Sequence, residues 1–207
     1  MARHYLRAFK IFLRKRKFMM LLKQLLAKFG FAKTSFEKLT FAALGAGSSV
    51  APLFFIKNPK YMKIGQNFSS LHNLRLEAWD SYAGTNYSPQ LSIGDNVCFN
   101  SDVHIGCIDK VQIGNNVLLA SRIFISDHSH GEINTEALKL PPIARQLFSK
   151  GPVIIEDNVW IGEGVSILHG VTIGKNAIIG ANAVVTKSIP PNCVAGGIPC
   201  KVLKALQ

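Results

Sequence analysis

Acidic residues are scarce in this sequence, and the imbalance is confined to one end. The 207 residues include 12 Asp or Glu against 24 Lys or Arg, which gives a formal net charge of +12. Residues 1–38 hold eleven of the basic residues and a single acid, Glu37, so this segment accounts for ten of the twelve excess charges. The rest of the chain is close to charge balance, so the function of the excess charge belongs to the N-terminal segment.

Residues 1–38 also lack an uncharged run of about 17 residues, which excludes a membrane-spanning helix there. Lys23 and Gln24 interrupt the apolar run, which argues against a cleavable signal peptide. Apolar residues recur every three or four positions between the charges, a pattern typical of a basic amphipathic helix. We expect residues 1–40 to form a basic amphipathic helical segment that either contacts an anionic inner-membrane surface through residues 1–38 or caps the rest of the fold.

Two further absences narrow the partners and the compartment. No recognised nucleic-acid motif accompanies the N-terminal charge, so nucleic acid is not an expected partner. The four cysteines form no C-x-x-C pair and no metal-binding spacing, which predicts free thiols in a reducing compartment and no metal site; they are Cys98, Cys107, Cys193 and Cys200. The expected location is the cytoplasm, with peripheral contact to the cytoplasmic face of the inner membrane.

The main positive feature is a strict six-residue repeat. An amphipathic helix has a period near 3.6 and an exposed strand a period of 2, so a period of six indicates short strands separated by corners. The larger inward residues are Ile155, Ile161, Ile167, Ile173, Ile179 and Val185. A second inward set comprises Val159, Val165, Val171, Ala177, Ala183 and Ile189. Two inward positions per unit would fill the interior of a narrow coil, and Gly162, Gly174 and Gly180 suit its sharp corners.

The repeat also runs backwards through the chain, with two interruptions. Ile93, Phe99 and Ile105 are six apart, and Ile113, Leu119 and Ile125 form a second such series. The step of eight between the two series predicts a two-residue bulge at residues 108–110. The step of thirty after Ile125 predicts a loop over residues 127–152, long enough to be functional. We expect one repeat domain over residues 41–207.

The repeat units themselves resemble those of hexapeptide-repeat acyltransferases. They include Ile-Gly-Asp-Asn-Val from Ile93, Ile-Gly-Asn-Asn-Val from Ile113, Ile-Gly-Glu-Gly-Val from Ile161 and Ile-Gly-Lys-Asn-Ala from Ile173. The resemblance implies an all-β fold, a left-handed parallel β-helix, in which three units make one coil. It also implies a homotrimer, because the family's site is built from two chains.

Two stretches narrow the resemblance within that superfamily. Residues 153–204, with Asn158-Val-Trp-Ile-Gly and Gly196-Gly-Ile-Pro-Cys-Lys, are similar to galactoside and maltose O-acetyltransferases. Ser126-Asp-His-Ser-His-Gly is closer to bacterial enzymes that acetylate O-antigen, lipopolysaccharide or capsule. The implied function is transfer of acetyl from acetyl-CoA to a sugar hydroxyl of a bacterial surface polysaccharide or of its lipid-linked precursor.

Such a reaction needs a base that removes the proton from the hydroxyl, and histidine has a suitable pKa. The resemblance marks His128 as that general base, with His130 as the rival that lines the same pocket if the chain is extended there. Asp127 is expected to be a solvated loop carboxylate, because neighbours on a strand point to opposite faces. His104 is expected to be an exposed surface histidine.

The resemblance also assigns binding residues. For the acceptor sugar it points to Asn100, an amide that donates and accepts, and Asp109 in the bulge is a weaker candidate. For CoA it points to Trp160, Ala181, Thr186, Lys187, Lys201 and Lys204. The sequence departs from the pattern of the galactoside enzymes in two places. Lys201 and Lys204 replace arginines, and Glu163 replaces a small hydroxyl residue, which puts a carboxylate beside an anionic cofactor.

Three alternatives remain open. The first is N-acetylation of an amino sugar or nucleotide sugar, although many such enzymes carry an extra domain for which this chain has no room. The second is a zinc enzyme resembling γ-class carbonic anhydrases, with His104, His128 and His130 as ligands; the one-residue gap between the last two argues against it. The third is a non-catalytic scaffold.

Overall fold

The computed structural model describes residues 36–206, and the repeat unit begins at Thr40. The predicted basic helical segment therefore lies outside the described residues, apart from a single 3-10 turn, η1 (Phe36–Lys38). Within residues 36–206, no helix is long and apolar enough to cross a membrane.

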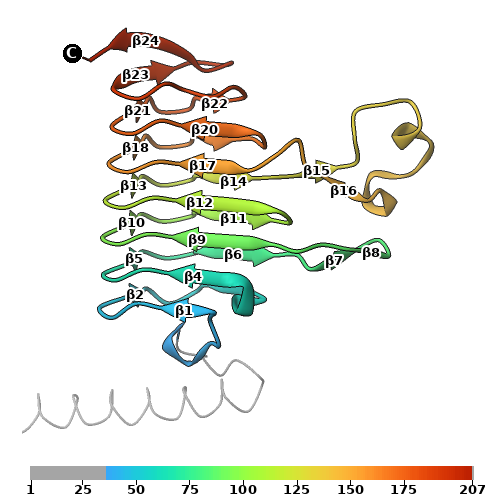
Figure 1. The fold of residues 1–207 in the computed structure, drawn as a ribbon, viewed down its shortest axis with the longest axis horizontal. Helices are drawn as coiled ribbons and strands as arrows, with labels where there is room; N and C mark the ends of the chain where they lie inside the picture. The colour runs from blue at the N-terminus through green and yellow to red at the C-terminus, as the bar shows by residue number, and fades with distance from the viewer. Residues whose placement is uncertain (1–35, 207) are drawn as a thin grey trace, which may run out of the picture. The chain divides into compact units, whose positions relative to one another are not determined.

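Three parallel sheets make up the repeat unit (Figure 1). The first sheet contains β1 (Ala43–Leu44), β4 (Met62–Ile64), β9 (Gln90–Ile93), β12 (Lys110–Ile113), β17 (Val153–Ile155) and β20 (Val171–Ile173). The second contains β2 (Ser49–Val50), β5 (Ser69–Ser70), β10 (Cys98–Phe99), β13 (Leu118–Leu119), β18 (Trp160–Ile161), β21 (Ile178–Ile179), β23 (Cys193–Gly196) and β24 (Lys201–Ala205). The third contains β3 (Phe55–Lys57), β6 (Arg75–Ala78), β11 (His104–Cys107), β14 (Phe124–Ser126), β19 (Ser166–Ile167) and β22 (Val184–Val185).

Within these three sheets, from β1 to β22, successive strands go to successive sheets, so each of these coils contributes one strand to each sheet; β23 and β24 both join the second sheet. Ile155 pairs with Ile173 in the next coil, and Ile161 pairs with Ile179, which is the register that a repeat of three six-residue units requires. The chain thus forms a left-handed parallel β-helix, as the repeat and the family resemblance predict. The last strand, β24, is the exception in direction, because it runs antiparallel to β23.

Both periodic sets of apolar residues point into the coil. The larger set, from Ile155 to Val185, is at most 1% exposed, and the smaller set from Val159 to Ala183 is equally buried. In the earlier coils the same positions hold bulkier side chains, and the Phe68 and Phe99 rings pack edge to face with 5.1 Å between centroids. The interior is a continuous apolar column, as the two inward positions per unit predict.

The corners are built by two different devices. At Gly162 a Cβ atom would lie 2.7 Å from the backbone nitrogen of Ala181 in the next coil, so this glycine is needed for close approach. At another corner, asparagines adopt left-handed backbone angles. Their side-chain amides form a ladder of hydrogen bonds from coil to coil, with N–O distances of 2.7–3.3 Å. The members of this ladder are Asn67, Asn96, Asn116, Asn158, Asn176 and Asn192.

Two excursions leave the coil on the same side of the stack (Figure 1). One is the predicted loop, which lies between β14 and β17 and contains β15 (Ser129–His130), η3 (Ala137–Lys139), η4 (Pro142–Ala144) and β16 (Leu147–Phe148). The other is a hairpin of β7 (Ser81–Tyr82) and β8 (Thr85–Asn86), which we did not predict; η2 (Pro59–Tyr61) lies in the preceding coil. The predicted two-residue bulge is present between β11 and β12, because Ile93 pairs with Ile113.

Candidate active site

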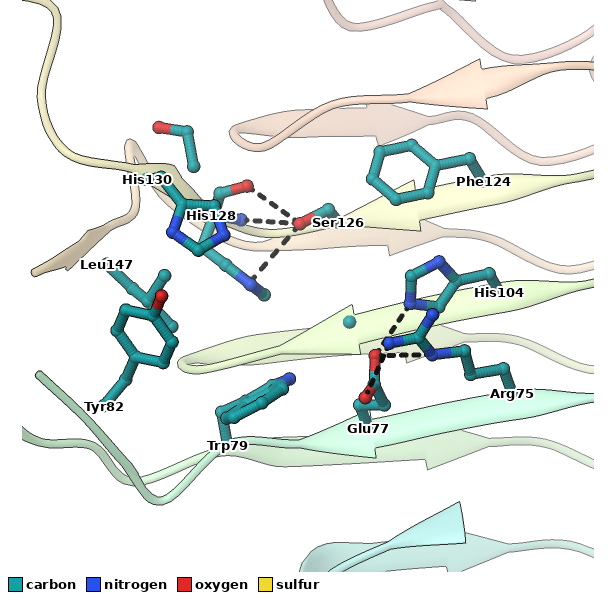
Figure 2. A pocket seen from close by; sticks show the side chains of 12 residues that line it. Arg75, Glu77, Trp79, Tyr82, His104, Phe124, Ser126, His128, His130 and Leu147 are labelled. Atoms are coloured by element: carbon teal, nitrogen blue, oxygen red, sulfur yellow. Dashed lines mark hydrogen bonds and ion pairs between the residues drawn. The ribbon is translucent and has the colours of Figure 1, made fainter. Parts of the chain in front are cut away.

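His128 lies where β14 ends and the long loop begins. The Ser126 hydroxyl donates to the carbonyl oxygen of His128 at 2.8 Å and accepts from the backbone N–H of His128 at 3.2 Å. This serine turn bends the chain directly after the strand. The bend, visible in Figure 2, brings the His128 ring back over the third sheet instead of continuing along it.

Asp127 is fully buried, so the expectation of a solvated loop carboxylate was wrong. Its side chain accepts the backbone N–H groups of Ile108 at 2.9 Å and Asp109 at 2.8 Å, and it accepts from Nδ1 of His128 at 2.8 Å. The alternation argument failed because the chain turns at Ser126 and is not extended there. The two-residue bulge thus supplies the backbone donors for a buried carboxylate that orients the adjacent histidine.

The hydrogen bond to Asp127 determines which ring nitrogen of His128 carries the proton. Because Nδ1 donates to the carboxylate, the neutral ring carries its proton on Nδ1 and presents a lone pair at Nε2. The side chain is 12% exposed, and it lies over Gly106 of β11, where a Cβ atom would be 3.1 Å from Cε1 of His128. An oriented, mostly covered imidazole with a free basic nitrogen is the arrangement that general-base catalysis requires.

A pocket opens in front of His128 (Figure 2). The outer face of the third sheet forms one part of it, and the hairpin and the long loop form the rest. Tyr82 of the hairpin meets the ring of His130 edge to face at 5.3 Å between centroids. The lining residues are Arg75, Glu77, Trp79, Tyr82, His104, Gly106, Phe124, Ser126, His128, Ser129, His130 and Leu147.

The hairpin and the long loop are also joined by hydrogen bonds behind the pocket. The hydroxyl of Tyr87 accepts the backbone N–H of Leu147 at 2.8 Å and donates to its carbonyl at 3.2 Å. The hydroxyl of Tyr82 donates to the carbonyl of Ile143 at 2.8 Å. Two segments about 60 residues apart in the chain therefore hold the pocket together.

Glu77 and His104 form a second pair in the pocket, so His104 is not the exposed surface histidine that we expected. Nε2 of His104 lies 2.9 Å from Oε2 of the buried Glu77 carboxylate, which also binds the Arg75 guanidinium. Sequence reasoning missed Glu77 and Trp79. The sequence signal for Glu77 was an acidic residue between the apolar residues Leu76 and Ala78 of a repeat strand.

Only two of the predicted site residues line the pocket, and the others lie elsewhere on the repeat unit. His128 and His130 both line the pocket, whereas Asn100 and Asp109 do not belong to its lining. Asn100 follows β10 at a half-buried corner, and the Asp109 side chain is exposed. The residues predicted for CoA lie elsewhere, with Trp160 half exposed on β18; the others are Ala181, Thr186, Lys187, Lys201 and Lys204, all exposed.

The carboxylate of Glu163, unexpected next to a CoA site, has a cationic partner. Its Oε1 lies 2.6 Å from a guanidinium nitrogen of Arg122, which occupies a left-handed corner one coil earlier. Both side chains are largely exposed, so the pair contributes little to stability. The ion pair nevertheless offsets the negative charge that Glu163 would present to an anionic ligand.

Two titratable groups near Asp127 have shifted pKa values. Burial raises the pKa of the Cys107 thiol, and the negative charge of Asp127 raises it further, so this cysteine stays protonated. Burial lowers the pKa of His169, and the positive charge of Lys150 adds to this effect. Nδ1 of His169 accepts the backbone N–H of Lys150 at 3.0 Å, which also favours the neutral ring.

Metal binding was the alternative role for the histidines. Among residues 36–206, no group of three or more His, Cys, Asp or Glu side chains is placed to hold a metal ion. One ring nitrogen of each histidine already has a carboxylate partner: Nδ1 of His128 contacts Asp127, and Nε2 of His104 contacts Glu77.

Known proteins share both the repeat and the fold. The model of the bacterial transferase hexapeptide family, described as six repeats, matches residues 152–187. Over 154 residues the chain is 39% identical to WbbJ of Escherichia coli K12, whose name describes a lipopolysaccharide biosynthesis O-acetyl transferase; the match covers 72% of this chain and 74% of WbbJ.

Two further comparisons extend the match. The chain is 39% identical to a galactoside O-acetyltransferase of E. coli K12 over 58% of this chain and 57% of the relative. A solved structure of the hexapeptide-repeat acetyltransferase VCA0836 of Vibrio cholerae O1 biovar eltor, complexed with acetyl coenzyme A, matches with a TM-score of 0.51 and 29% identity. That match covers 81% of this chain and 72% of the other.

Proposed function

The chain belongs to the bacterial hexapeptide transferase family, and on that premise we propose that it acetylates a sugar hydroxyl of a bacterial surface polysaccharide or of its lipid-linked precursor, with acetyl-CoA as donor and His128 as general base. The observation that carries the proposal is the 2.8 Å hydrogen bond from Nδ1 of His128 to the buried carboxylate of Asp127. This bond leaves Nε2 of His128 with a free lone pair. Because His128 lines a surface pocket, we propose that an acceptor hydroxyl reaches this nitrogen.

In the proposed reaction, Nε2 of His128 takes the hydroxyl proton as the sugar oxygen forms a bond to the thioester carbonyl carbon. The carbon–sulfur bond then breaks, and the proton on Nε2 passes to the departing thiolate, which leaves as CoA thiol. The histidine is positively charged between these two steps. The buried carboxylate of Asp127 stabilises that charge and holds the ring in one orientation.

Acetyl-CoA as the donor is supported by the acetyl coenzyme A bound in the related VCA0836 structure. We propose that Trp160 lies beside the acetyl end, that Ala181 contacts the pantetheine arm, and that the remaining predicted residues bind the nucleotide. These are Thr186, Lys187, Lys201 and Lys204, all of which are exposed and free to reach a ligand. The two lysines of β24 present point charges to phosphate.

The homotrimer that the family resemblance implies is supported by the separation of the predicted residues within one chain. Trp160, Lys201 and Lys204 belong to the second sheet, whereas the His128 pocket lies on the third. Asn100, proposed with Asp109 to contact the acceptor, is not part of that pocket either. A second copy of the chain that places its second sheet against this pocket would bring the two groups together.

The proposed acceptor, a lipopolysaccharide-type sugar, is supported by the name of WbbJ and by the galactoside O-acetyltransferase match. The test is transfer of acetyl from labelled acetyl-CoA to a membrane extract of the source organism that contains lipid-linked glycans, with the product detected by mass. Wild type and the control His72→Ala, whose ring lies outside the pocket and contacts Pro52, should transfer acetyl, and His128→Ala should not.

Three results would change the proposal. Equal transfer by wild type and His128→Ala would remove His128 from the chemistry and turn attention to His130. An acetyl group that resists mild alkali would indicate an amide and therefore N-acetylation, because O-acetyl esters hydrolyse under those conditions. An absence of transfer by wild type, despite binding of acetyl-CoA, would reject this class of acceptor.

A further inference from the structure

The pocket contains a second histidine–carboxylate pair, which the proposed mechanism does not use. His104 and Glu77 line the same pocket as His128 (Figure 2), whose own carboxylate partner, Asp127, is fully buried. The two pairs differ in which ring nitrogen is held: Nδ1 of His128 contacts its carboxylate, whereas Nε2 of His104 contacts Glu77, in both cases within 2.9 Å. The nitrogen left to bind a ligand is therefore Nε2 on His128 and Nδ1 on His104.

Glu77 is a fixed part of this arrangement. It is 4% exposed, and its two carboxylate oxygens accept from the Arg75 guanidinium at 2.9 Å and 3.1 Å. Because Nε2 of His104 faces this carboxylate at 2.9 Å, the contact favours the His104 tautomer with the proton on Nε2. Nδ1 of that tautomer is an acceptor. The ring of Phe124, edge to face with His104 at 5.3 Å, limits how the imidazole can turn.

The strand register places the two histidines on either side of a hollow. His104 pairs with Arg75 and Phe124 in the neighbouring strands, and Gly106, two residues along, pairs with Glu77 and Ser126. Because alternate residues share a face, His104 and Gly106 both point outward. Gly106 has no side chain to fill that face, and the ring of His128 lies over it.

An aromatic wall adjoins this polar floor. Trp79 follows β6 and meets Tyr82 of the hairpin edge to face at 5.7 Å between centroids, and both line the pocket. The ammonium group of Lys57 lies 3.1 Å from the centre of the Trp79 ring, which fixes the indole in place. A sugar ring presents apolar C–H groups on its faces and hydroxyls around its edge, so an aromatic wall next to a polar floor suits it.

Resting on the proposed function, we propose that His104 is an acceptor-binding residue that determines which hydroxyl is acetylated. Nδ1 of His104 accepts a hydrogen bond from one sugar hydroxyl, and a neighbouring hydroxyl meets Nε2 of His128. Trp79 packs on the sugar ring, and Glu77 and Arg75 are positioning residues that hold the His104 tautomer. The specificity of the enzyme is then set by the spacing of two hydroxyls on the acceptor.

The test compares two substitutions of His104 that separate a binding role from a structural one. In His104→Gln the side-chain amide reaches the position of Nε2, so the contact with Glu77 survives while the Nδ1 acceptor is lost. In His104→Asn the amide oxygen replaces Nδ1, so the acceptor survives while the contact with Glu77 is lost. His72→Ala is the matched control, because His72 lies outside the pocket lining.

The probes are methyl glycosides of galactose, glucose and N-acetylglucosamine, titrated into the full chain and followed by saturation-transfer NMR. We expect at least one probe to bind wild type and the control, with its ring protons saturated from Trp79. Its dissociation constant should rise roughly 3- to 10-fold in His104→Gln, the effect of one hydrogen bond, and less in His104→Asn. For a probe that is also acetylated, His104→Gln should raise KM with kcat little changed, whereas His128→Ala should lower kcat.

Equal binding by His104→Gln and wild type would overturn the proposal, and so would failure of every glycoside to bind wild type. Binding that depends on His104 without any acetyl transfer would contradict the proposed function and leave the sugar-binding role of His104 standing. A more specific experiment removes the hydroxyl of the sugar probe and leaves the His104 side chain in place. A deoxy probe that lacks the hydroxyl bound by His104 should bind wild type and His104→Gln equally.

Discussion

The carboxylate of Asp127 accepts a hydrogen bond from Nδ1 of His128, its neighbour in the chain, at 2.8 Å. Adjacent residues rarely orient one another in this way on a strand, and the turn built by Ser126 makes it possible. Asp127→Asn should keep the shape of the site but replace the carboxylate by a neutral amide and perturb the tautomer of His128. We expect kcat for acetyl transfer to fall by about 10²- to 10⁴-fold.

The measurement is single-turnover acetyl transfer at saturating acetyl-CoA, with binding of CoA followed separately. His72→Ala serves as the control, because the His72 ring is hydrogen-bonded to the Pro52 carbonyl at 3.2 Å and lies outside the pocket lining. If Asp127→Asn kept the wild-type kcat while its thermal midpoint fell, the carboxylate would have a structural role alone.

Gly106 leaves the space that the ring of His128, the proposed general base, occupies. A Cβ atom at this position would lie 3.1 Å from Cε1 of His128, so Gly106→Ala should displace the imidazole by a few tenths of an ångström. We expect kcat to fall by about 10- to 100-fold, since small misplacements of a catalytic group are costly. Gly180→Ala is the control for the fold, because its Cβ would have an ordinary 3.5 Å contact with the Ala195 carbonyl. Similar losses of thermal midpoint in both variants, with activity intact, would refute the steric argument.

Tyr87 holds the long loop to the hairpin through one hydroxyl. Tyr87→Phe removes two hydrogen bonds to the backbone of Leu147 and leaves the N–H of this buried residue without its partner. The expected cost is about 1–3 kcal/mol of local stability. Hydrogen exchange should therefore accelerate across residues 127–150 and stay unchanged at the coil strands. Tyr61→Phe, which loses a 3.3 Å bond to Asp80, is the control, and equal exchange in both variants would show that the tether is dispensable.

His169 should make the stability of the fold depend on pH. Its pKa is lowered by burial and by Lys150, so the unfolded chain takes up a proton more readily than the folded chain as pH falls through about 6.5. The free energy of unfolding should therefore decrease as pH drops below about 6.5, and part of that decrease should vanish in His169→Asn, whose amide oxygen still accepts from Lys150. The measurement is urea denaturation at pH 5.5 and 7.5. An identical difference between the two pH values in both proteins would exclude His169 as the source.

The basic N-terminal segment predicts salt-dependent binding to anionic lipid. Replacing Arg14, Lys15, Arg16 and Lys17 by glutamine should weaken co-sedimentation with phosphatidylglycerol vesicles, with each charge contributing about 1 kcal/mol. Neutral phosphatidylcholine vesicles are the lipid control, and replacing Lys57, Lys60, Lys63 and Lys110 is the matched charge control. Equal binding by both variants would favour the capping role for residues 1–38.

The six-residue period predicted the coil well, because the residue types that each unit requires lie next to one another in the sequence. Each inward position must be apolar and each corner must be tight, so Ile155, Gly162 and their equivalents repeat visibly in the sequence. The hairpin at residues 81–86 was missed because its two-residue strands carry no apolar pattern of their own. Glu77 and Trp79 were missed because their role depends on which loops cover the third sheet, and that is decided by contacts such as Tyr87 with Leu147.

The glycine corners show a similar limit. We predicted tight corners at Gly162, Gly174 and Gly180, and the reason at Gly162 is crowding by the next coil. The unusual backbone angles fall instead on asparagines such as Asn158, whose side chains join the coils. A single sequence shows which residue types recur at a corner, but the ladder of amides depends on the stacking of one coil on another.

The bulge at Ile108–Asp109 and the loop that starts at Asp127 are separate insertions in the repeat, 18 residues apart at their nearest contact. Each insertion is destabilising alone. Without Asp127 the two amide groups of the bulge lose their acceptor, and without the bulge the buried Asp127 carboxylate loses its two backbone donors and keeps only His128. The pair is therefore epistatic. We expect an evolutionary path from a plain coil to this site to acquire the two insertions together or to pass through a less stable intermediate.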